Sequence, residues 1–239
     1  MNIAIILSGG VGSRMGLSIP KQYIEVNGRP IIDWCVSTFA RRADIEKIII
    51  VAAPKWIGCV NECTSRYAKS IILADAGESR QHSVLNGLKA AAASGCSAND
   101  IVIIHEAARP LVSDKIIDDC IRGVEDGFDG VMPALMVKDT IYISDDGMTV
   151  SGLLDRGSLR AGQSPESFRL GSYLALNERM TCEELLGIKG SAELAFRAGQ
   201  RVKITEGDED NFKITTPADL VRFKRIVENN RMFGKQGDE

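Results

Sequence analysis

The sequence predicts an α/β fold, in which a mostly parallel β-sheet is covered by helices on both faces. Short, nearly continuous apolar runs, rich in β-branched residues, alternate with longer segments of helical pattern. The chain has 239 residues and 44% hydrophobic content, enough for one substantial core. We expect strands at 3–7, 47–52, 70–74, 101–105 and 130–134. The expected helices between them are at 30–42, 56–68, 80–93 and 114–126.

The pattern changes after the fifth expected strand. Two apolar segments, 137–144 and 148–153, flank the turn sequence Asp145-Asp146-Gly147, which predicts a β-hairpin. We expect residues 137–155 to project as an arm from a single domain of residues 1–239, and such an arm can reach another subunit. The remaining elements are helices at 170–180, after Thr181, at 191–198 and from Thr216-Pro217, and a strand at 202–205.

Composition and charge exclude several classes of protein. The net charge of −3 and the pI near 5.6 give no overall positive field, so we expect no nucleic-acid partner. No apolar run approaches the roughly 20 residues of a membrane span, and the N-terminal sequence lacks the features of a signal peptide. We therefore expect a cytoplasmic protein. Its six scattered cysteines suit reduced thiols.

A glycine-rich segment directly follows the first expected strand. Residues 8–16 read Ser-Gly-Gly-Val-Gly-Ser-Arg-Met-Gly, and Pro-Lys-Gln follows at 20–22. Glycines let a backbone approach a polyphosphate closely, while Arg14 and Lys21 supply positive charge. The segment lacks the Gly-Lys-Ser/Thr of a Walker loop, and Met15 replaces the third glycine of a dinucleotide fingerprint. The pattern therefore predicts an anion site of another kind.

This segment and four later motifs resemble the cytidylyltransferases of 2-C-methyl-D-erythritol 4-phosphate and their relatives that act on ribitol 5-phosphate. The later motifs are Gly77-Glu78-Ser79-Arg80 with Ser83-Val84; His105-Glu106-Ala107-Ala108-Arg109-Pro110; Lys138-Asp139-Thr140 with Arg156 and Gln163-Ser164-Pro165; and Asp210-Asn211-Phe212-Lys213-Ile214-Thr215-Thr216-Pro217. The resemblance covers most of the chain. It implies a three-layer α/β/α, Rossmann-like nucleotidyltransferase fold with a projecting β-hairpin arm, and a homodimer.

The resemblance also implies the reaction. A phosphate oxygen of a sugar-alcohol phosphate attacks the α-phosphorus of CTP, CMP is transferred and pyrophosphate leaves. Because a phosphate monoester is already a nucleophile, no general base is needed, and we expect His82 and His105 to be structural. Catalysis then consists of holding two anions together and neutralising the developing charge with arginine, lysine and Mg²⁺.

Candidate site residues follow from the matching motifs. The expected catalytic cations are Arg14, Lys21 and Lys213. The expected nucleotide-binding residues are Leu7, Ser8, Gly9, Gly10, Gly12, Arg14, Lys21, Gly77, Glu78 and Ser83. The expected acceptor-binding residues are Glu106, Arg109, Thr140, Arg156 and Ser164, with Glu106 also on the metal. In the family, part of this last set comes from the arm of a partner subunit.

The chain departs from the family pattern mainly on the acceptor side. Glu106 replaces Asp, Ser164 replaces Thr, Glu166 replaces Gln, and Lys189-Gly190-Ser191 stands where Thr-Asp-Glu is common. Glutamate at 106 moves the carboxylate by more than about 1 Å. Glu166 adds a negative charge where an anion is expected to bind.

The acceptor stays open at this stage. Methylerythritol phosphate is the first hypothesis, which Tyr23 and the 138–140 motif favour. Ribitol 5-phosphate is the alternative, which Gly162 and the Pro-Lys-Trp at 54–56 favour. Another polyol phosphate, a phosphonate, or an inactive relative that binds CTP or a CDP-product are further alternatives.

Overall fold

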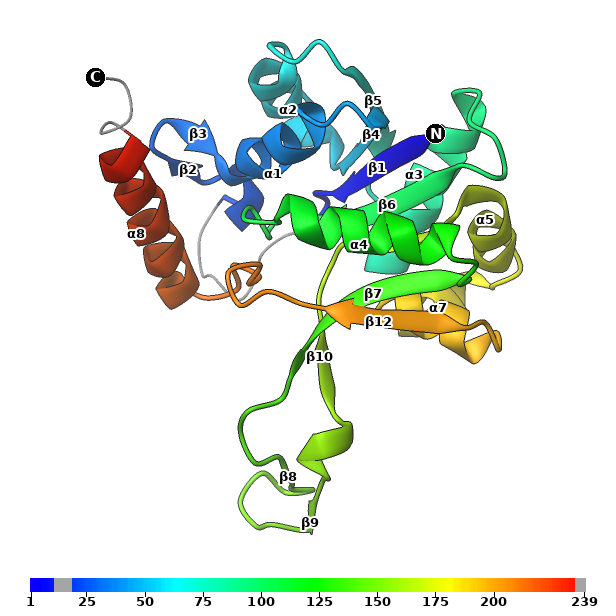
Figure 1. Ribbon diagram of the computed structural model, residues 1–239, viewed down its shortest axis with the longest axis vertical. Coiled ribbons are helices and arrows are strands. Elements are labelled where there is room, and N and C mark those ends of the chain that lie inside the picture. Colours follow the sequence, from blue (N-terminus) through cyan, green and yellow to red (C-terminus); the bar gives the residue numbers. More distant parts are fainter. Residues whose placement is uncertain (11–18, 235–239) are drawn as a thin grey trace.

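The computed structural model describes residues 1–10 and 19–234, and places eight strands in one twisted sheet (Figure 1). The strand order is β10-β7-β11-β6-β1-β4-β5, with β12 on the outer side of β7. The strands are β1 (Asn2–Leu7), β4 (Ile45–Ala52), β5 (Ser70–Asp75), β6 (Ile101–Glu106), β7 (Gly130–Met136), β10 (Arg160–Gly162), β11 (Glu166–Arg169) and β12 (Val202–Glu206). All pairings are parallel except those of β10 and β11, so the predicted mostly parallel sheet is confirmed.

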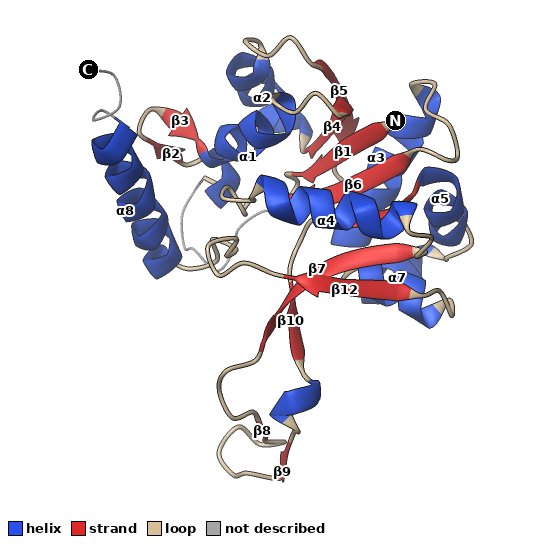
Figure 2. Ribbon diagram, in the orientation of Figure 1, coloured by secondary structure: helices blue, strands red, loops and turns tan. Residues whose placement is uncertain are grey.

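Helices cover both faces of the sheet (Figure 2). They are α1 (Ile31–Ala40), α2 (Ile57–Thr64), α3 (Arg80–Ala93), α4 (Asp114–Glu125), α5 (Leu170–Glu178), α6 (Cys182–Gly187), α7 (Ser191–Arg197) and α8 (Pro217–Gly234). Successive β-strand residues point to opposite faces. Ala4 and Ile6 therefore pack with α1, α2 and α4, whereas Ile3 and Ile5 pack with α3, α5 and α7.

A smaller apolar cluster attaches the last helix to the body. Phe223 and Val227 of α8 pack on Ile31 and on Val26 of the short hairpin β2 (Glu25–Val26) and β3 (Arg29–Pro30). Ile214 completes this cluster, and its N–H donates to the carbonyl of Ala108. The segment that carries Lys213 is thus held against the end of β6.

The arm projects from the sheet between β7 and β10 (Figure 1). Its two strands are shorter than predicted, because β8 (Tyr142–Ile143) and β9 (Gly152–Leu153) have two residues each and the turn between them is longer. Asp146 stabilises this turn through its carboxylate, which accepts from the N–H groups of Met148 and Thr149.

One other expectation needs correction. The helix predicted at 56–68 is a 3-10 turn (Pro54–Trp56) followed by α2, which ends at Thr64. The hydroxyl of Thr64 donates to the carbonyl of Val60, and side-chain bonds of this kind compete with helix continuation. Strands β10 and β11 were not predicted.

The capping box at Thr181 and Glu184 is confirmed. Within the described residues, none of the helices is both long enough and apolar enough to cross a membrane.

Candidate active site

The site is built where the central strands β1 and β6 end. Leu7 and Glu106 are register partners on these parallel strands, and the N–H of Ala107 donates to the carbonyl of Leu7 at 3.0 Å. The glycine-rich segment after β1 and the motif after β6 therefore begin side by side. Ligands of open α/β sheets bind outside the carboxyl ends of the strands, and this edge agrees with that rule.

Gln22 and Tyr23 fix the start of the glycine-rich segment. The Gln22 side-chain amide donates to the carbonyls of Ser8 at 2.6 Å and Gly10 at 2.7 Å, and the Ser8 hydroxyl donates to the Tyr23 hydroxyl at 2.7 Å. Both side chains are buried in the short 3-10 helix Lys21–Tyr23. Gln22 and Tyr23 of the Pro-Lys-Gln-Tyr motif thus orient the peptide groups of Ser8 and Gly10, a role that the sequence signalled only through the motif itself.

Gly9 lets the segment after β1 approach the segment after β5, and Gly77 lets the latter segment pack closely on the start of α3. A Cβ on Gly9 would overlap the Cβ of Ala76, and a Cβ on Gly77 would overlap His82 at the start of α3. The N–H of Gly77 donates to the hydroxyl of Ser83 at 3.0 Å. The structure therefore brings together Gly9, Gly10, Gly77 and Ser83 of the expected nucleotide site. The side chains of Ser8 and Ser83 are bonded within the fold, which leaves backbone groups as the nucleotide contacts we expect there.

Gly9 and Gly10 provide a matched pair for testing this contact. We expect Gly9→Ala to lower the free energy of unfolding by about 1–3 kcal/mol, because the added methyl meets backbone-anchored atoms of Ala76. Gly10→Ala serves as the control, since a Cβ there meets no atom within 4 Å. Urea unfolding of both variants measures the difference. Equal stability of the two variants would contradict the close approach.

The remaining members of the nucleotide set lie in different places. Gly12 and Arg14 lie outside the described residues, so their predicted roles stay predictions. Lys21 is half-buried at the first position of its 3-10 helix, and Glu78 is exposed immediately before the helix α3. Ser79 caps α3 by accepting from the N–H of His82, and Gly9 lies close to Ser83 in the first turn of this helix, so the positive end of α3 lies beside Gly9.

Glu106 is the centre of the charged cluster. Its Oε1 accepts from Lys213 Nζ at 2.7 Å and from Arg80 Nε at 3.4 Å, and its Oε2 accepts from Arg109 Nε at 3.2 Å. Burial alone would raise the pKa of Glu106, but the charges of Lys213, Arg80 and Arg109 outweigh it and lower the pKa to about 2. The carboxylate is therefore ionised at neutral pH.

The predicted acceptor residue Ser164 is hydrogen-bonded to the backbone of Glu106. Its hydroxyl accepts from the Glu106 N–H at 3.2 Å and lies 3.1 Å from Nδ1 of His105. Because the Nε2 of His105 faces the carbonyl of Arg109 at 2.9 Å, Nε2 carries the proton and Ser164 donates to Nδ1. Burial lowers the pKa of His105 to about 4. His105 is thus neutral and structural, as predicted, and a contact of Ser164 with the acceptor stays a prediction.

Arg80 and Glu166 form the deepest part of the cluster. Arg80 Nη2 donates to Glu166 Oε2 at 2.6 Å, and Glu166 is 4% exposed. The carboxylate also accepts from the N–H groups of Ser191 and Ala192, the first residues of α7. The negative charge of Glu166 is therefore compensated inside the protein and does not face an incoming anion. This role of Arg80 was not predicted, although Arg80 belongs to the Gly77-Glu78-Ser79-Arg80 motif.

The two other predicted acceptor residues lie on the arm. Thr140 and Arg156 are exposed, and Arg156 Nη1 donates to the carbonyl of Lys138 at 2.8 Å across the base of the arm. No hydrogen bond or ion pair within the described part of the chain joins either residue to Glu106. One chain therefore assembles Glu106, Arg109, Ser164 and Lys213, but not Thr140 and Arg156.

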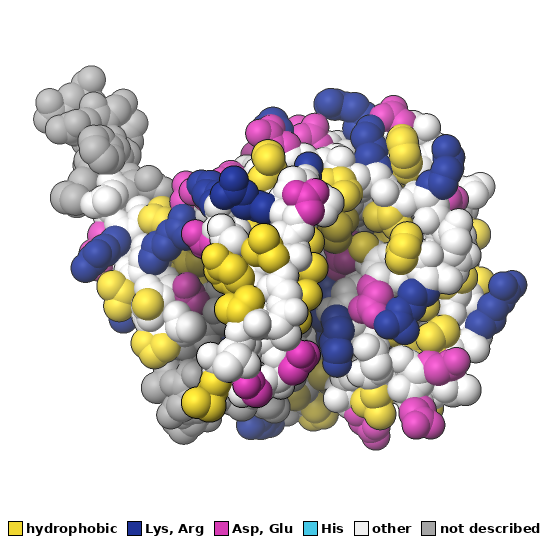
Figure 3. All heavy atoms as spheres, turned by 90° about the horizontal axis from the view of Figure 1, so that it is seen from below, with side chains coloured by type: hydrophobic (Ala, Val, Ile, Leu, Met, Phe, Trp, Pro, Cys, Tyr) yellow, Lys and Arg dark blue, Asp and Glu magenta, His cyan; other side chains and the backbone are white. Residues whose placement is uncertain are grey.

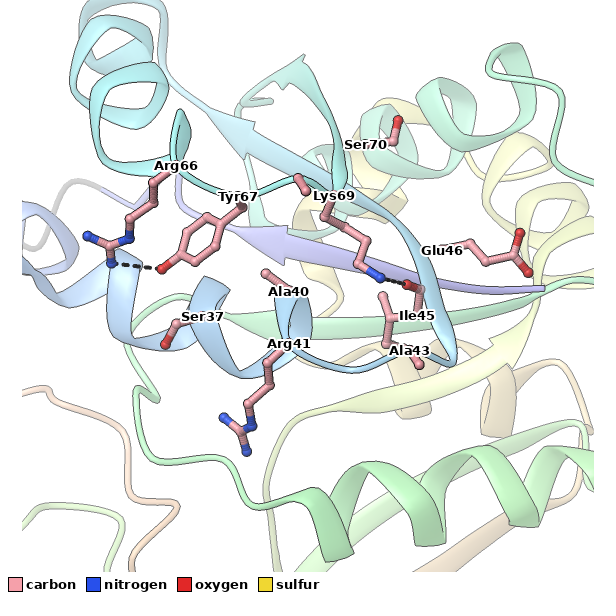
Figure 4. Close-up of a pocket in the computed structure, with 11 residues that line it drawn as sticks. Ser37, Ala40, Arg41, Ala43, Ile45, Glu46, Arg66, Tyr67, Lys69 and Ser70 are labelled. Atoms are coloured by element: carbon pink, nitrogen blue, oxygen red, sulfur yellow. Dashed lines mark hydrogen bonds between the residues drawn. The ribbon is translucent and has the colours of Figure 1, made fainter. Parts of the chain in front are cut away.

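A separate hollow lies at the opposite edge of the sheet, at the amino ends of β4 and β5 (Figure 4). Its basic side chains are already bonded. Lys69 donates to the carbonyl of Ile45 at 2.6 Å, and Arg66 donates to the hydroxyl of Tyr67 at 2.8 Å. Since these groups stabilise the fold, we place the candidate active site at the carboxyl edge.

The sequence matches the model of one protein family, described as IspD, 2-C-methyl-D-erythritol 4-phosphate cytidylyltransferase, over residues 2–229. The chain belongs to this family. The Rubrobacter xylanophilus enzyme of that name is 38% identical over 233 residues, with 94% of each chain covered. The Geobacillus thermodenitrificans enzyme of that name is 37% identical, covering 94% of this chain and 96% of the relative. A ribitol-5-phosphate cytidylyltransferase of Streptococcus agalactiae is 30% identical, covering 98% and 100%.

Solved structures of cytidylyltransferases confirm the fold. The Francisella tularensis 2-C-methyl-D-erythritol 4-phosphate cytidylyltransferase aligns with a TM-score of 0.78 and 26% identity, covering 93% of this chain and 99% of that one. The Anaerococcus prevotii 4-diphosphocytidyl-2C-methyl-D-erythritol synthase has the same TM-score at 24% identity, covering 95% and 98%. The predicted nucleotidyltransferase fold is thus confirmed over nearly the whole chain.

Proposed function

We propose that this cytidylyltransferase moves CMP from CTP to 2-C-methyl-D-erythritol 4-phosphate and releases pyrophosphate. The observation that carries the proposal is the Glu106 centre, where one carboxylate and three cations lie directly beside the glycine-rich segment. Together with Glu166, the cluster contains three cations and two carboxylates, which leaves one net positive charge for anionic substrates. The match to the methylerythritol phosphate family supports this acceptor.

In the proposed reaction, an oxygen of the acceptor phosphate forms a bond to the α-phosphorus of CTP. The bond from that phosphorus to the bridging oxygen of the β-phosphate breaks, and the electron pair leaves with pyrophosphate. Lys21, Lys213 and Arg14 would neutralise the triphosphate and the charge that develops, and Arg109 would bind the acceptor phosphate. Lys213 and Arg109 are held by Glu106 beforehand, so little reorganisation accompanies the reaction.

Magnesium fits this donor set. Mg²⁺ is usually bound by one or two carboxylates together with substrate phosphates, and no group of three or more His, Cys, Asp or Glu that would make a cage of protein ligands occurs in the described segments. The ionised Glu106 carboxylate would contribute the protein ligand. The bound metal would neutralise the charge of the phosphates.

The use of CTP also supports a cytoplasmic location.

A homodimer would complete the acceptor site. Large apolar side chains are exposed along the arm, including Tyr142 at 61%, Met148 at 91% and Leu153 at 63%. The view from the side towards which the arm projects shows several apolar side chains on the surface of the protein (Figure 3). Exposed apolar surface of this kind favours a protein interface. In the dimer, Thr140 and Arg156 of one arm would reach the Glu106 centre of the partner.

Mixing two inactive variants tests this shared site. We expect Arg156→Ala and Lys213→Ala each to lose activity, whereas a mixture that exchanges subunits recovers up to about one quarter of the wild-type rate. The reason is that half of the dimers are hybrids, and each hybrid has one site with both native residues. Sedimentation of the wild-type protein checks that a dimer is present. A mixture as inactive as its components, despite confirmed subunit exchange, would contradict the shared site.

An acceptor panel tests the activity itself. Pyrophosphate release from CTP is measured with 2-C-methyl-D-erythritol 4-phosphate, D-ribitol 5-phosphate, a polyol phosphonate and no acceptor. We expect kcat/KM to be highest with methylerythritol phosphate by at least about 100-fold, because the acceptor groups must match a preorganised site. A preference for ribitol 5-phosphate would reassign the acceptor, and release with none of the acceptors would exclude the activity.

A further inference from the structure

Arg80 joins three elements of the acceptor side. It is the first residue of α3, and its guanidinium donates to three groups from three parts of the chain. Nε lies 3.4 Å from Oε1 of Glu106, the last residue of β6, Nη2 lies 2.6 Å from Glu166 Oε2 on β11, and Nη1 lies 2.9 Å from the hydroxyl of Ser191 on α7. All three partners are buried or nearly so. A planar guanidinium can bind several acceptors in fixed directions, which an ammonium cannot do.

The start of α7 is held from two sides. Glu166 accepts from the N–H of Ala192 at 2.7 Å and from the N–H of Ser191 at 3.3 Å. From the other side, the hydroxyl of Tyr173 donates to the carbonyl of Ser191 at 3.0 Å, and Gln81 donates to that hydroxyl. The position of Ser191 relative to Arg80 is therefore fixed by buried hydrogen bonds.

Position 191 is a second place from which a carboxylate would reach Arg80. The Ser191 hydroxyl lies 2.9 Å from Arg80 Nη1, so a glutamate at this position would face the same guanidinium that Glu166 contacts.

We propose that Arg80 is a positioning residue for the acceptor, and that the charge of Glu166 holds its guanidinium in place. Arg80 acts through Glu106, since its Nε lies 3.4 Å from the carboxylate that the proposed function places beside the acceptor. This inference rests on the proposed function.

The test is a charge relocation. Glu166→Gln keeps an acceptor for the Ala192 N–H but removes the charge beside Arg80. We expect it to raise the KM for methylerythritol phosphate by about tenfold or more, with the KM for CTP within about twofold of wild type. Adding Ser191→Glu returns a carboxylate to Arg80, so the double variant should recover to within about threefold. Glu183→Gln on the exposed surface of α6 is the matched control.

Arg80→Lys covers the case in which Glu166→Gln fails to fold. It keeps the charge but loses the planar guanidinium that contacts three groups at once, so the same selective rise in the acceptor KM is expected in the folded variant. An equal change in both KM values, no change, or a double variant as impaired as the single variant would overturn the proposal. If the wild-type protein itself forms no product with any acceptor, the proposed function fails, and the relocation is then judged by whether Ser191→Glu restores the melting temperature of Glu166→Gln.

Discussion

Replacing Lys21 with alanine is expected to lower kcat by about 10²–10³-fold, the usual effect of removing one preorganised electrostatic stabiliser of a transition state. Lys21 follows Pro20 at the start of the 3-10 helix whose next two residues fix the glycine-rich segment. We therefore expect its amine to lie beside the triphosphate. Steady-state pyrophosphate release from CTP and methylerythritol phosphate measures the effect.

Lys55 provides the control for this variant. It is an exposed lysine in the 3-10 helix Pro54–Trp56, which follows the carboxyl end of β4. Its ammonium lies 5.5 Å from the centre of the Trp56 ring. Lys55→Ala should keep the wild-type rate within about twofold. A Lys21→Ala enzyme that turns over at the wild-type rate would remove Lys21 from the mechanism. A loss of secondary structure would show instead that the residue is needed for folding.

Glu106→Gln is expected to affect both stability and turnover. The substitution leaves Arg80, Arg109 and Lys213 without their shared carboxylate, and breaking a buried ion pair from one side costs about 3–5 kcal/mol. We expect a free energy of unfolding lower by about 3 kcal/mol at pH 7, and a loss of CMP transfer of at least about 100-fold. Chemical unfolding and pyrophosphate release provide the two measurements.

The pH dependence of stability tests whether the loss of stability in Glu106→Gln comes from the lost charge of Glu106. The pKa of Glu106 falls from 4.5 to about 2 on folding, so the unfolded chain binds the proton more readily. The stability contributed by the carboxylate is fully present above pH 4.5 and is lost as the pH falls towards 2. Glu106→Gln should lack this part of the acid sensitivity, whereas Glu106→Asp should keep it because the charge is retained. Identical acid unfolding of the Gln variant and the wild type would contradict the assignment.

The central strands were predictable because burial on both faces requires continuous apolar sequence. Ile3–Ile6 and Ile48–Val51 are fully buried, and their patterns gave the strands directly. Strand β11 was not predictable in this way, since Glu166, Ser167 and Arg169 leave Phe168 as its one apolar residue. Its place in the sheet is set by antiparallel pairing with β6 and β7, and its acidic residue is compensated by Arg80, far away in sequence.

The residues of the site were predictable where they belong to family motifs. Glu106 and Lys213 are 107 residues apart, and their ion pair follows from the family motifs but not from any local pattern. The motifs could not show that the hydroxyls of Ser8 and Ser83 are used inside the fold. They also gave no partner for Glu166. In both respects the missing information was which side chains meet, and only the packed structure supplies it.

An oxygen label tests whether the acceptor phosphate attacks the α-phosphorus of CTP. 2-C-methyl-D-erythritol 4-phosphate carrying ¹⁸O in its phosphate group is incubated with CTP, Mg²⁺ and the enzyme, and the products are analysed by mass spectrometry. We expect a CDP-methylerythritol product that retains all of the label, with unlabelled pyrophosphate. Pyrophosphate that carries the label, or its release at the same rate without acceptor, would contradict it.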